Sequence, residues 1–468
     1  MKIIMKFGGT SVGSVPALEK VVGIVRKAFD EGHQVITVVS AMSGVTNKLI
    51  EAAHQAEAGD EAIARRTRRE IEEKHSQTTL AFLGQSTVRE AVMAEIQALL
   101  DEFELLCHGI HVLGELTPRA LDVISGMGER MNVRQITAIL NVNNLPALPV
   151  DATALIVTDN RHGAASPLLE ETARQTRITL APCFERGQIP VVAGFIAATQ
   201  AGVPTTLGRG GSDYSATILG RAIKADEIWI WTDVNGVMTA DPRVVPNART
   251  IPQLSYAEVG ELAYFGAKVL HPQAIRPARR AEIPVRILNT FEPDHPGTLI
   301  NNRIDTNGHV VKAITVIKNL SLITVAGTGM IGIPGVAARI FSAVARIGSS
   351  VLMISQSSSE QSICFVVNTT ESPAVQAVLS EEMARELERR DLDEISTQDD
   401  IVILAVVGAG MQGTPGVSAR VFGALGHFGI NVIAIAQGSS EFNISLVVIE
   451  GEADEAVRAI HEEFRLHA

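Results

Sequence analysis

The chain has 468 residues, of which 46% are hydrophobic and 20% charged, and its formal net charge is −12 at pH 7. This length predicts about three domains, and the acidic balance, with no basic run to offset it, argues against nucleic acid or an anionic membrane as a partner. The 3 cysteines are scattered without ligand spacing, no apolar run approaches the ~20 residues of a membrane span, and no signal-peptide pattern opens the chain, so we expect a cytoplasmic protein.

The first segment predicts a parallel β–α–β unit. Lys2–Phe7 is β-branched and apolar, Ala17–Asp30 has helical periodicity, and Gln34–Ser40 is an apolar strand of the kind that is buried on both faces. With a right-handed connection, the carboxyl ends of both strands meet at one edge of the sheet. We therefore expect the turns 6–11 and 40–47 at that edge.

Two glycines follow the first strand. Gly8 and Gly9 are not a Walker A loop, because no Gly-Lys-Ser/Thr sequence comes after them. The preceding Lys6 has two interpretations. It is an ordinary exposed lysine at the end of a strand, or its ammonium lies over a phosphate that the glycine amides hold.

Residues 47–113 predict helices, and the mixed-charge run 61–74 is typical of a solvated helix face, to which we assign no chemistry. The glycine-spaced turn Ser125–Glu129 then leads into a predicted helix, Arg130–Leu140. Glu129 either complements the dipole in the first turn of this helix or receives the ammonium group of a substrate.

The strongest site pattern lies between the predicted strand Ile189–Phe195 and a helix that begins at Tyr214. Its sequence is Thr205-Thr-Leu-Gly-Arg-Gly-Gly-Ser-Asp-Tyr-Ser-Ala216. The three glycines let backbone N–H groups approach an anion closely, and Arg209 adds a planar fork suited to a carboxylate or phosphate. We expect Ser212 and Asp213 to cap the helix, so that its positive end points at the same place. The pattern predicts an anion site, which Asp213 would oppose unless it orients a cation or a donor.

The polar loop 232–243 follows a predicted strand at Ala225–Trp231. Its Asn-Gly and Asp-Pro pairs are turn signals that explain a loop by themselves. Alternatively, Thr232, Asp233 and Arg243 hold the base, ribose and phosphates of a nucleotide. A helix is expected at Ser255–Phe265, a second lysine beside a glycine is Lys268, and the last strand of this domain is expected at Val285–Asn289.

The last third of the chain contains a duplication. The segment Gly327-Thr-Gly-Met-Ile-Gly-Ile-Pro-Gly-Val-Ala-Ala-Arg339 returns 81 residues later as Gly408-Ala-Gly-Met-Gln-Gly-Thr-Pro-Gly-Val-Ser-Ala-Arg420, and Gln356 returns as Gln437. Each copy predicts strand, Gly/Pro loop, helix, strand, polar turn, strand and helix, that is, a small α+β unit. The glycines Gly335 and Gly416 at the helix starts, with the two glutamines, predict a pocket for a small zwitterion.

Strand counting predicts that the two units are nested. The second copy has no room for a closing strand, whereas an extra strand, Val310–Ile317, precedes the first copy. We therefore expect residues 305–317 and 395–468 to form one α+β domain, with residues 318–394 inserted as another. Residues 1–300 form the predicted first, larger domain.

The ordered motifs resemble the aspartate kinase family over essentially the whole chain. They are Lys6-Phe-Gly-Gly-Thr-Ser11, Ser40-Ala-Met-Ser-Gly-Val-Thr-Asn47, Gly126-Met-Gly-Glu129, Thr206-Leu-Gly-Arg-Gly-Gly-Ser-Asp-Tyr-Ser215, Trp231-Thr-Asp233, Asp241-Pro-Arg243 and Phe265-Gly-Ala-Lys-Val-Leu-His271. The resemblance implies an amino-acid-kinase fold, α/β with a mostly parallel sheet between helices, followed by two ferredoxin-like ACT domains. It further implies phosphoryl transfer from ATP to L-aspartate, by the monofunctional form because no dehydrogenase follows.

The resemblance also implies roles, each carried over by position. Lys6, Gly8 and Gly9 would contact the transferred phosphoryl group, and Asp213 would organise the lysines and the metal-bound phosphates. Aspartate would be bound by Thr46, Glu129, Arg209 and Ser212, and ATP by Thr232, Asp233, Arg243 and Lys268, with Mg²⁺ carried by the nucleotide rather than by a protein metal site. The chain departs from the family at Met238, where a tyrosine is common.

Regulation and assembly follow from the tail. Gln356 and Gln437 resemble the effector-binding glutamines of threonine-sensitive members, so we expect L-threonine as effector, with L-lysine as the alternative. Open sheet edges in the ACT domains favour a homodimer or tetramer. Two other readings stay open: a kinase of another acid, such as glutamate, N-acetylglutamate or carbamate, and an amino-acid sensor with an inactive kinase domain.

Overall fold

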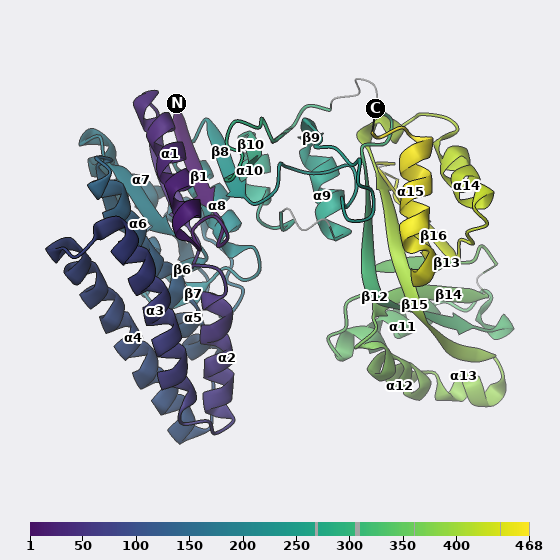
Figure 1. Cartoon of the computed structure of the whole chain (residues 1–468). Helices are drawn as coiled ribbons and strands as arrows, with labels where there is room; N and C mark the ends of the chain where they lie inside the picture. The colour runs from purple at the N-terminus through teal and green to yellow at the C-terminus, as the bar shows by residue number, and fades with distance from the viewer. Residues whose placement is uncertain (267–269, 305–308, 360, 440, 468) are drawn as a thin grey trace. The chain divides into compact units, whose positions relative to one another are not determined.

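The computed structural model describes residues 1–468 except 267–269, 305–308, 360, 440 and 468 (Figure 1). It divides into two compact units. The first comprises Met1–Val237, Thr250–Tyr256 and Val269–Arg303, and the second comprises Met238–Arg249, Ala257–Lys268 and Ile304–Ala468. The catalytic domain was predicted to end at residue 300. Two segments before that boundary, Met238–Arg249 and Ala257–Lys268, belong to the second unit instead.

The first unit is built on an eight-stranded sheet in the order β3-β5-β2-β1-β8-β10-β11-β9. All neighbours are parallel except β10 and β11, as expected for the fold class. Most of these strands are apolar and buried on both faces of the sheet. In β5, for example, all residues are buried. The strands are β1 (Lys2–Phe7), β2 (Gln34–Val39), β3 (Ala147–Val150), β5 (Ile189–Ala193), β8 (Glu227–Thr232), β9 (Gln253–Ser255), β10 (Val285–Asn289) and β11 (Thr298–Asn301). β10 was predicted to be the last strand of this sheet, which is wrong because β11 returns antiparallel beside it.

Three helices of the first unit, α1, α4 and α5, begin at side-chain caps. The hydroxyls of Ser14, Ser86 and Thr117 each accept a hydrogen bond from the backbone N–H three residues later. The helices are α1 (Val15–Asp30), α2 (Val45–Glu57), α3 (Ile63–Leu83), α4 (Thr87–Leu113), α5 (Pro118–Ser125), α6 (Met127–Val142), α7 (Leu169–Glu185), α8 (Gly211–Ile223) and α10 (Arg276–Arg280). A separate small sheet of β4 (Val157–Thr158), β6 (Ile196–Thr199) and β7 (Pro204–Thr206) lies next to the Gly-Arg-Gly-Gly loop in sequence.

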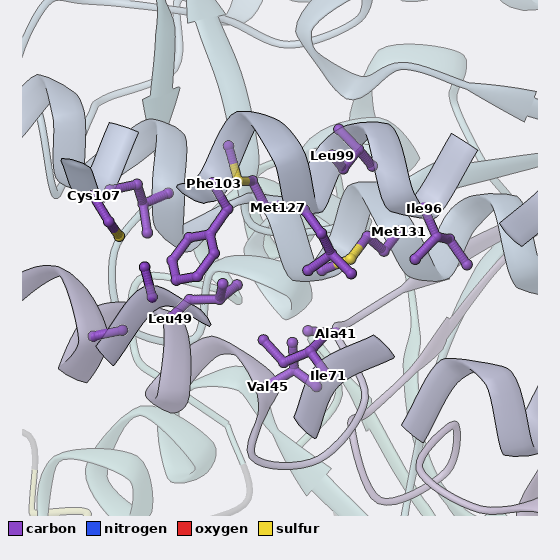
Figure 2. Packing of buried hydrophobic residues seen from close by; sticks show 14 of the residues in the cluster. Ala41, Val45, Leu49, Ile71, Ile96, Leu99, Phe103, Cys107, Met127 and Met131 are labelled. Carbon is purple, nitrogen blue, oxygen red and sulfur yellow. The ribbon is translucent and has the colours of Figure 1, made fainter. Parts of the chain in front are cut away.

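Helices α2 to α6 share one buried hydrophobic cluster. Figure 2 shows the Phe103 ring of α4 among Leu49, Cys107 and Met127. The sulfhydryl of Cys107 is buried, and this burial raises the pKa of the thiol to about 12. Cys107 therefore acts as a small apolar core residue, consistent with its lack of ligand spacing.

The second unit is built on a six-stranded antiparallel sheet in the order β13-β14-β12-β15-β17-β16. Figure 1 shows its two long strands, β12 (Ala313–Ala326) and β15 (Glu394–Val407), side by side. The shorter strands are β13 (Met353–Gln356), β14 (Ser362–Asn368), β16 (Ala434–Gln437) and β17 (Asn443–Ile449). Its helices are α11 (Val336–Arg346), α12 (Ser372–Glu382), α13 (Ala384–Arg389), α14 (Val417–His427) and α15 (Ala453–Glu463).

The long strands connect the two repeats. The first part of β12, Ala313–Ile317, pairs with Ile403–Val407 of β15, which in turn pairs with β17. This pairing is the one that the nested arrangement expects. A register shift follows Ile317, at Asn319 (φ 61°), and the residue at the matching repeat position, Asp400, also has a positive φ (56°). Each repeat has its own hydrophobic core. We therefore propose that the predicted boundary between residues 317 and 318 separates the two domains, at the register shift in β12.

The two transferred segments pack on this sheet. Thr239 accepts a hydrogen bond from the backbone N–H of Ile314 (2.9 Å), and its hydroxyl lies 3.0 Å from Nε2 of His461. Helix α9 (Tyr256–Tyr264) supplies the fully buried Glu258, which forms an ion pair with Lys312 (3.1 Å) and accepts a hydrogen bond from Ala409 N–H (2.9 Å). These contacts explain why both segments belong to the second unit.

Replacing Phe103 by Ala is expected to lower the free energy of unfolding by about 3–5 kcal/mol, because it leaves a large cavity in the helical core. Urea denaturation monitored by circular dichroism measures this value. Leu105 lies on the same helix but is 71% exposed, so Leu105→Ala is the control and should change stability by less than about 0.5 kcal/mol. Equal effects of the two substitutions would contradict the assigned core.

Candidate active site

A cavity of about 610 Å³ lies at the carboxyl edge of the first sheet, where the predicted turns meet. The end of β1, the turn after β2, the starts of α2, α6 and α8, helix α5 and the loop before α8 all contribute to it. Six residues that the sequence marked as site residues line it: Lys6, Thr46, Glu129, Arg209, Ser212 and Asp213. The fold thus gathers side chains that are up to about 200 positions apart in the chain.

Lys6 ends β1 and is only 9% exposed. Its Nζ lies 2.6 Å from Oδ1 of Asp213, which belongs to the first turn of α8. The prediction that Ser212 and Asp213 cap this helix is wrong: the N-cap is Gly210, whose left-handed backbone (φ 72°) lets the helix begin at Gly211 instead of the expected Tyr214. Asp213 is therefore free to pair with a cation, which removes the repulsion that an anion site would otherwise suffer.

The glycine turn after Lys6 is held from two sides. Gly8 N–H donates to the carbonyl of Trp231 (3.2 Å), so this amide is already used in the structure, unlike the expectation that it binds phosphate. At Gly9 a Cβ would stand 3.1 Å from the carbonyl of Ala41, and the Gly9 carbonyl accepts from Ser43 N–H. Gly9 therefore allows the turn after β1 to pack closely against the turn after β2.

Glu129 is buried at the start of α6, with 4% exposure. Burial raises the pKa of its carboxyl from 4.5 to about 8, against the opposing effects of hydrogen bonds and of Lys6. Within the described part of the chain, its Oε2 has no hydrogen-bond partner. A Cβ at Gly128 would come within 2.7 Å of Ala41 and 3.7 Å of Thr46 Oγ1, so this glycine lets α6 approach α2 and brings Glu129 and Thr46 to one cavity.

Arg209 stands at the tip of the loop before α8. Gly208 and Gly210 on either side have positive φ values of 74° and 72°. At Gly210 a Cβ would lie 2.7 Å from Cβ of His271, which shows how closely the loop is packed. Arg209 is exposed and forms no ion pair with any described residue, so its guanidinium is available to an anion in the cavity.

Phe195 and Asp122 are among the cavity residues that sequence reasoning missed. Phe195 has a left-handed backbone (φ 71°), which is unfavourable for a bulky residue, and its N–H donates to Ser215 Oγ (2.9 Å). The glycine before it, Gly194, packs against Ser212 at a distance that no side chain would tolerate. A Gly-Phe pair at the end of a strand carried no signal of this conformation. Asp122 lay in a segment that the sequence analysis did not interpret.

The expected nucleotide residues are only partly brought together. Thr232 is the last residue of β8 and Asp233 follows it, beside the Trp231 carbonyl that accepts from Gly8 N–H, but neither lines the cavity. Arg243 belongs to the second unit, where it is exposed and pairs with Asp241 (2.6 Å). Lys268 lies outside the described residues.

Comparisons with known proteins identify the family of this chain. Residues 1–289 match the model of the amino acid kinase family, and residues 323–383 and 404–464 match the model of an ACT domain. The chain belongs to the aspartokinase branch of the amino acid kinase family.

Relatives and solved structures in this branch match nearly the whole chain. Aspartokinase 1 of Arabidopsis thaliana is 35% identical over 98% of this chain and 80% of its own. A bifunctional aspartokinase/homoserine dehydrogenase of the same plant is 38% identical over 99% of this chain, which spans 51% of that relative. Escherichia coli aspartokinase III in complex with aspartate and ADP superposes with a TM-score of 0.81, at 30% identity over 99% of this chain and 100% of that chain. The complex of the same enzyme with lysine and aspartate superposes with a TM-score of 0.77, at 31% identity over 99% of each chain.

The expected effector residues of this aspartokinase-type chain occupy equivalent places in the two ACT repeats. Gln356 and Gln437 end β13 and β16, the two outer strands of the sheet. Gly335 and Gly416 are the N-caps of α11 and α14, with φ values of 93° and 86°. Among the described residues, no helix is long and apolar enough to cross a membrane, and no cluster of His, Cys, Asp and Glu is suited to a metal ion.

Replacing Glu129 by Gln is expected to flatten the pH dependence of stability. Because the pKa of Glu129 is raised from 4.5 to about 8 on folding, the folded state binds more protons than the unfolded state between these values. The wild type therefore loses stability as pH rises through this window. Glutamine is neutral throughout, so the stability difference (variant minus wild type) should grow by at least about 1 kcal/mol between pH 5 and pH 8.

Urea denaturation at several pH values measures this difference. The exposed Glu90 in the first turn of α4 provides the control variant, Glu90→Gln, which removes a carboxylate at the same kind of helix position. Parallel curves for Glu129→Gln and the wild type would contradict a raised pKa for Glu129.

Proposed function

We propose that the protein is an aspartate kinase that transfers the γ-phosphoryl group of ATP to the side-chain carboxylate of L-aspartate, forming 4-phospho-L-aspartate and ADP. The observation that carries the proposal is the cavity in which the Lys6–Asp213 pair, Arg209 and the buried Glu129 face one another. The aspartate and ADP bound in the superposed aspartokinase III fit the same assignment. This reaction would begin the synthesis of lysine, threonine and methionine, in the cytoplasm.

The residue types suit a carboxylate acceptor. The nucleophile is the substrate's own carboxylate, which is ionised at neutral pH, so no protein nucleophile or strong base is required. Catalysis then consists of aligning two anions and neutralising the charge on the transferred phosphoryl group. Lys6 at the end of β1 supplies the positive charge, Asp213 fixes the position of its ammonium, and Gly9 lets the turn approach the phosphates.

Substrate binding divides between the two sides of the cavity. Arg209 has the planar fork that binds a carboxylate through two hydrogen bonds, and Thr46 and Ser212 supply hydroxyls beside it. Glu129 has an unpartnered Oε2 that the ammonium of a free amino acid would satisfy. Such a cation would also lower the pKa of Glu129 back toward its usual range, so substrate binding and Glu129 ionisation favour each other. An acceptor without a free ammonium, such as N-acetylglutamate or carbamate, would leave this oxygen unsatisfied.

The nucleotide would lie at the end of β8. We assign Thr232 and Asp233 to the nucleoside, and Arg243 and Lys268 to the phosphates, on the motifs that they share with the family. Mg²⁺ would arrive with ATP as part of the substrate, since Mg²⁺ retains waters and phosphate ligands more readily than it accepts an all-protein cage. Met238 would stand where relatives often place a tyrosine.

An amino acid would regulate the enzyme at the ACT repeats. The polar ends of β13 and β16, with the helix N-termini behind Gly335 and Gly416, form two similar places for a zwitterion. We favour L-threonine and retain L-lysine as the alternative, which the lysine complex of aspartokinase III supports. Ile354 and Ile435 are 49% and 45% exposed on these outer strands, and pairing of the strands with a second copy would cover them in a dimer or tetramer.

Aspartyl-hydroxamate formation tests the proposal. With ATP, Mg²⁺ and L-aspartate, the protein should give product, and L-threonine should suppress it more strongly than L-lysine. Gln356→Ala and Gln437→Ala should each weaken this inhibition. Product from L-glutamate in place of L-aspartate would contradict the substrate assignment, and a folded protein without product from any acid would favour an amino-acid sensor.

Lys6→Ala should lower kcat by about 10²–10³, because it removes the positive charge that the transition state requires. Arg209→Ala should mainly raise KM for L-aspartate. Lys2, exposed on the same strand, provides the control Lys2→Ala. Steady-state kinetics separate the effects, and a Lys6→Ala enzyme with near-normal kcat would exclude the phosphoryl role.

A further inference from the structure

Asp122 is a buried carboxylate that lines the cavity. It belongs to α5 and is 3% exposed. Both of its oxygens accept hydrogen bonds: Gly163 N–H donates to Oδ1 (3.0 Å) and Oδ2 (3.1 Å), the Thr206 hydroxyl donates to Oδ1, and His162 Nδ1 lies 2.7 Å from Oδ2. Because these partners occupy the oxygens, Asp122 is arranged to hold protein groups rather than substrate.

The partners of Asp122 come from two separate segments of the chain. His162 and Gly163 lie in a turn that is closed at its base by the hydrogen bond from Asp159 N–H to the Ser166 carbonyl (3.0 Å). Thr206 ends β7 and leads into Gly208 and Arg209. Asp122 therefore joins the 159–166 turn to the start of the loop that carries Arg209.

The two segments touch directly at the residue before Arg209. Ala165 N–H donates to the Thr206 carbonyl (2.9 Å), and a Cβ at Gly208 would stand only 3.1 Å from the Gly163 carbonyl. Gly208 thus rests against the backbone that Asp122 fixes. Arg209 itself has no ion pair with a described residue and no hydrogen bond from one, so its place depends on the loop beneath it.

We propose that Asp122 is a positioning residue for the acceptor substrate: by locking the His162–Gly163 turn under Gly208, it sets where the Arg209 guanidinium meets the substrate carboxylate. The alternative is that the same bonds only stabilise the fold. The hydrogen bonds of Asp122 converge on the two backbone segments that support Gly208, the residue before Arg209. This convergence favours a positioning role. The inference rests on the proposed function, which assigns Arg209 to L-aspartate.

A double-mutant cycle distinguishes the two roles. Asp122→Ala and Arg209→Ala should each raise KM for L-aspartate by about tenfold or more, since each removes a charge-assisted contact or its support. If Asp122 acts through Arg209, the double variant should match Arg209→Ala within about twofold. Multiplied effects in the double variant, or an unchanged KM in folded Asp122→Ala, would overturn the proposal. KM for ATP should change by less than about twofold, since Asp122 lies on the acceptor side.

Two further variants separate positioning from loss of fold. Asp122→Asn keeps an oxygen that can accept from Gly163 and Thr206, so it should recover most of the KM lost in Asp122→Ala. Asp159→Asn changes a carboxylate in the same turn, whose side chain accepts hydrogen bonds from the N–H groups of Arg161 and Ser166. This variant should leave KM within about twofold of the wild type. An Asp159→Asn variant as impaired as Asp122→Ala would indicate a general effect of the turn.

A readout without turnover keeps the inference distinct from the proposed function. The Kd for L-aspartate, measured by calorimetry, should show the same non-additive effects of Asp122→Ala and Arg209→Ala as KM does. Hydrogen exchange at the backbone N–H groups of Gly163 and Ala165 should accelerate in Asp122→Ala but not in Arg209→Ala. Absence of product from the wild type would refute the kinase assignment alone. Unchanged exchange together with unchanged aspartate binding in Asp122→Ala would refute the role of Asp122.

Discussion

The ion pair between Lys6 and Asp213 is the interaction on which the catalytic unit depends. It joins the end of the first strand to the first turn of α8, across more than two hundred residues of chain. A buried lysine or aspartate alone would be costly to desolvate, whereas together they leave a positive group at the mouth of a cavity without an uncompensated charge. An arriving phosphate would share the lysine with Asp213, so the pair holds the ammonium in place before the anion binds.

Close backbone contacts make this arrangement possible. Gly9, Gly128 and Gly194 each stand where a side chain would collide with a neighbouring turn or helix. These three glycines therefore serve packing, and the N–H of Gly8 donates to the carbonyl of Trp231. The result is a rigid edge on which Lys6, Thr46 and Glu129 are positioned by strand ends and helix starts.

The elements that periodicity specifies were predictable, and those that depend on tertiary contacts were not. β1 and β10 have the predicted bounds, because short apolar runs between turn residues define buried strands. The strand β11 was missed because its alternation of buried and half-buried residues covers only Thr298–Asn301. Its pairing with β10 is recognisable only in the folded sheet. In the site, charged residues beside glycines were found from sequence. The strained Phe195 and the inward-facing Asp122 were missed, since their roles arise from contacts made by distant segments.

The duplicated tail shows how a repeat becomes asymmetric. In each repeat the Gly-x-Gly segment packs on the residues that directly precede the neighbouring long strand: Gly327 and Gly329 on Asp391–Asp393, and Gly408 and Gly410 on Val310–Lys312. These two supporting segments are themselves 81 residues apart, so the nesting is reciprocal. Only the second carries a lysine, Lys312, at the position where the first has Asp393.

Lys312 gives the second repeat a contact that the first does not have. It pairs with the buried Glu258 of α9, which also accepts the N–H of Ala409 at the base of the Gly/Pro loop. Breaking a buried pair of this kind costs about 3–5 kcal/mol, far more than a surface contact. A displacement of the Gly/Pro loop at Ala409 must therefore either displace α9 as well or break these contacts of Glu258 at that cost. The same unit holds Thr239 and Arg243, so the segment that carries an expected nucleotide residue belongs to the unit of the antiparallel sheet, whereas β8, the strand that precedes it, belongs to the first unit.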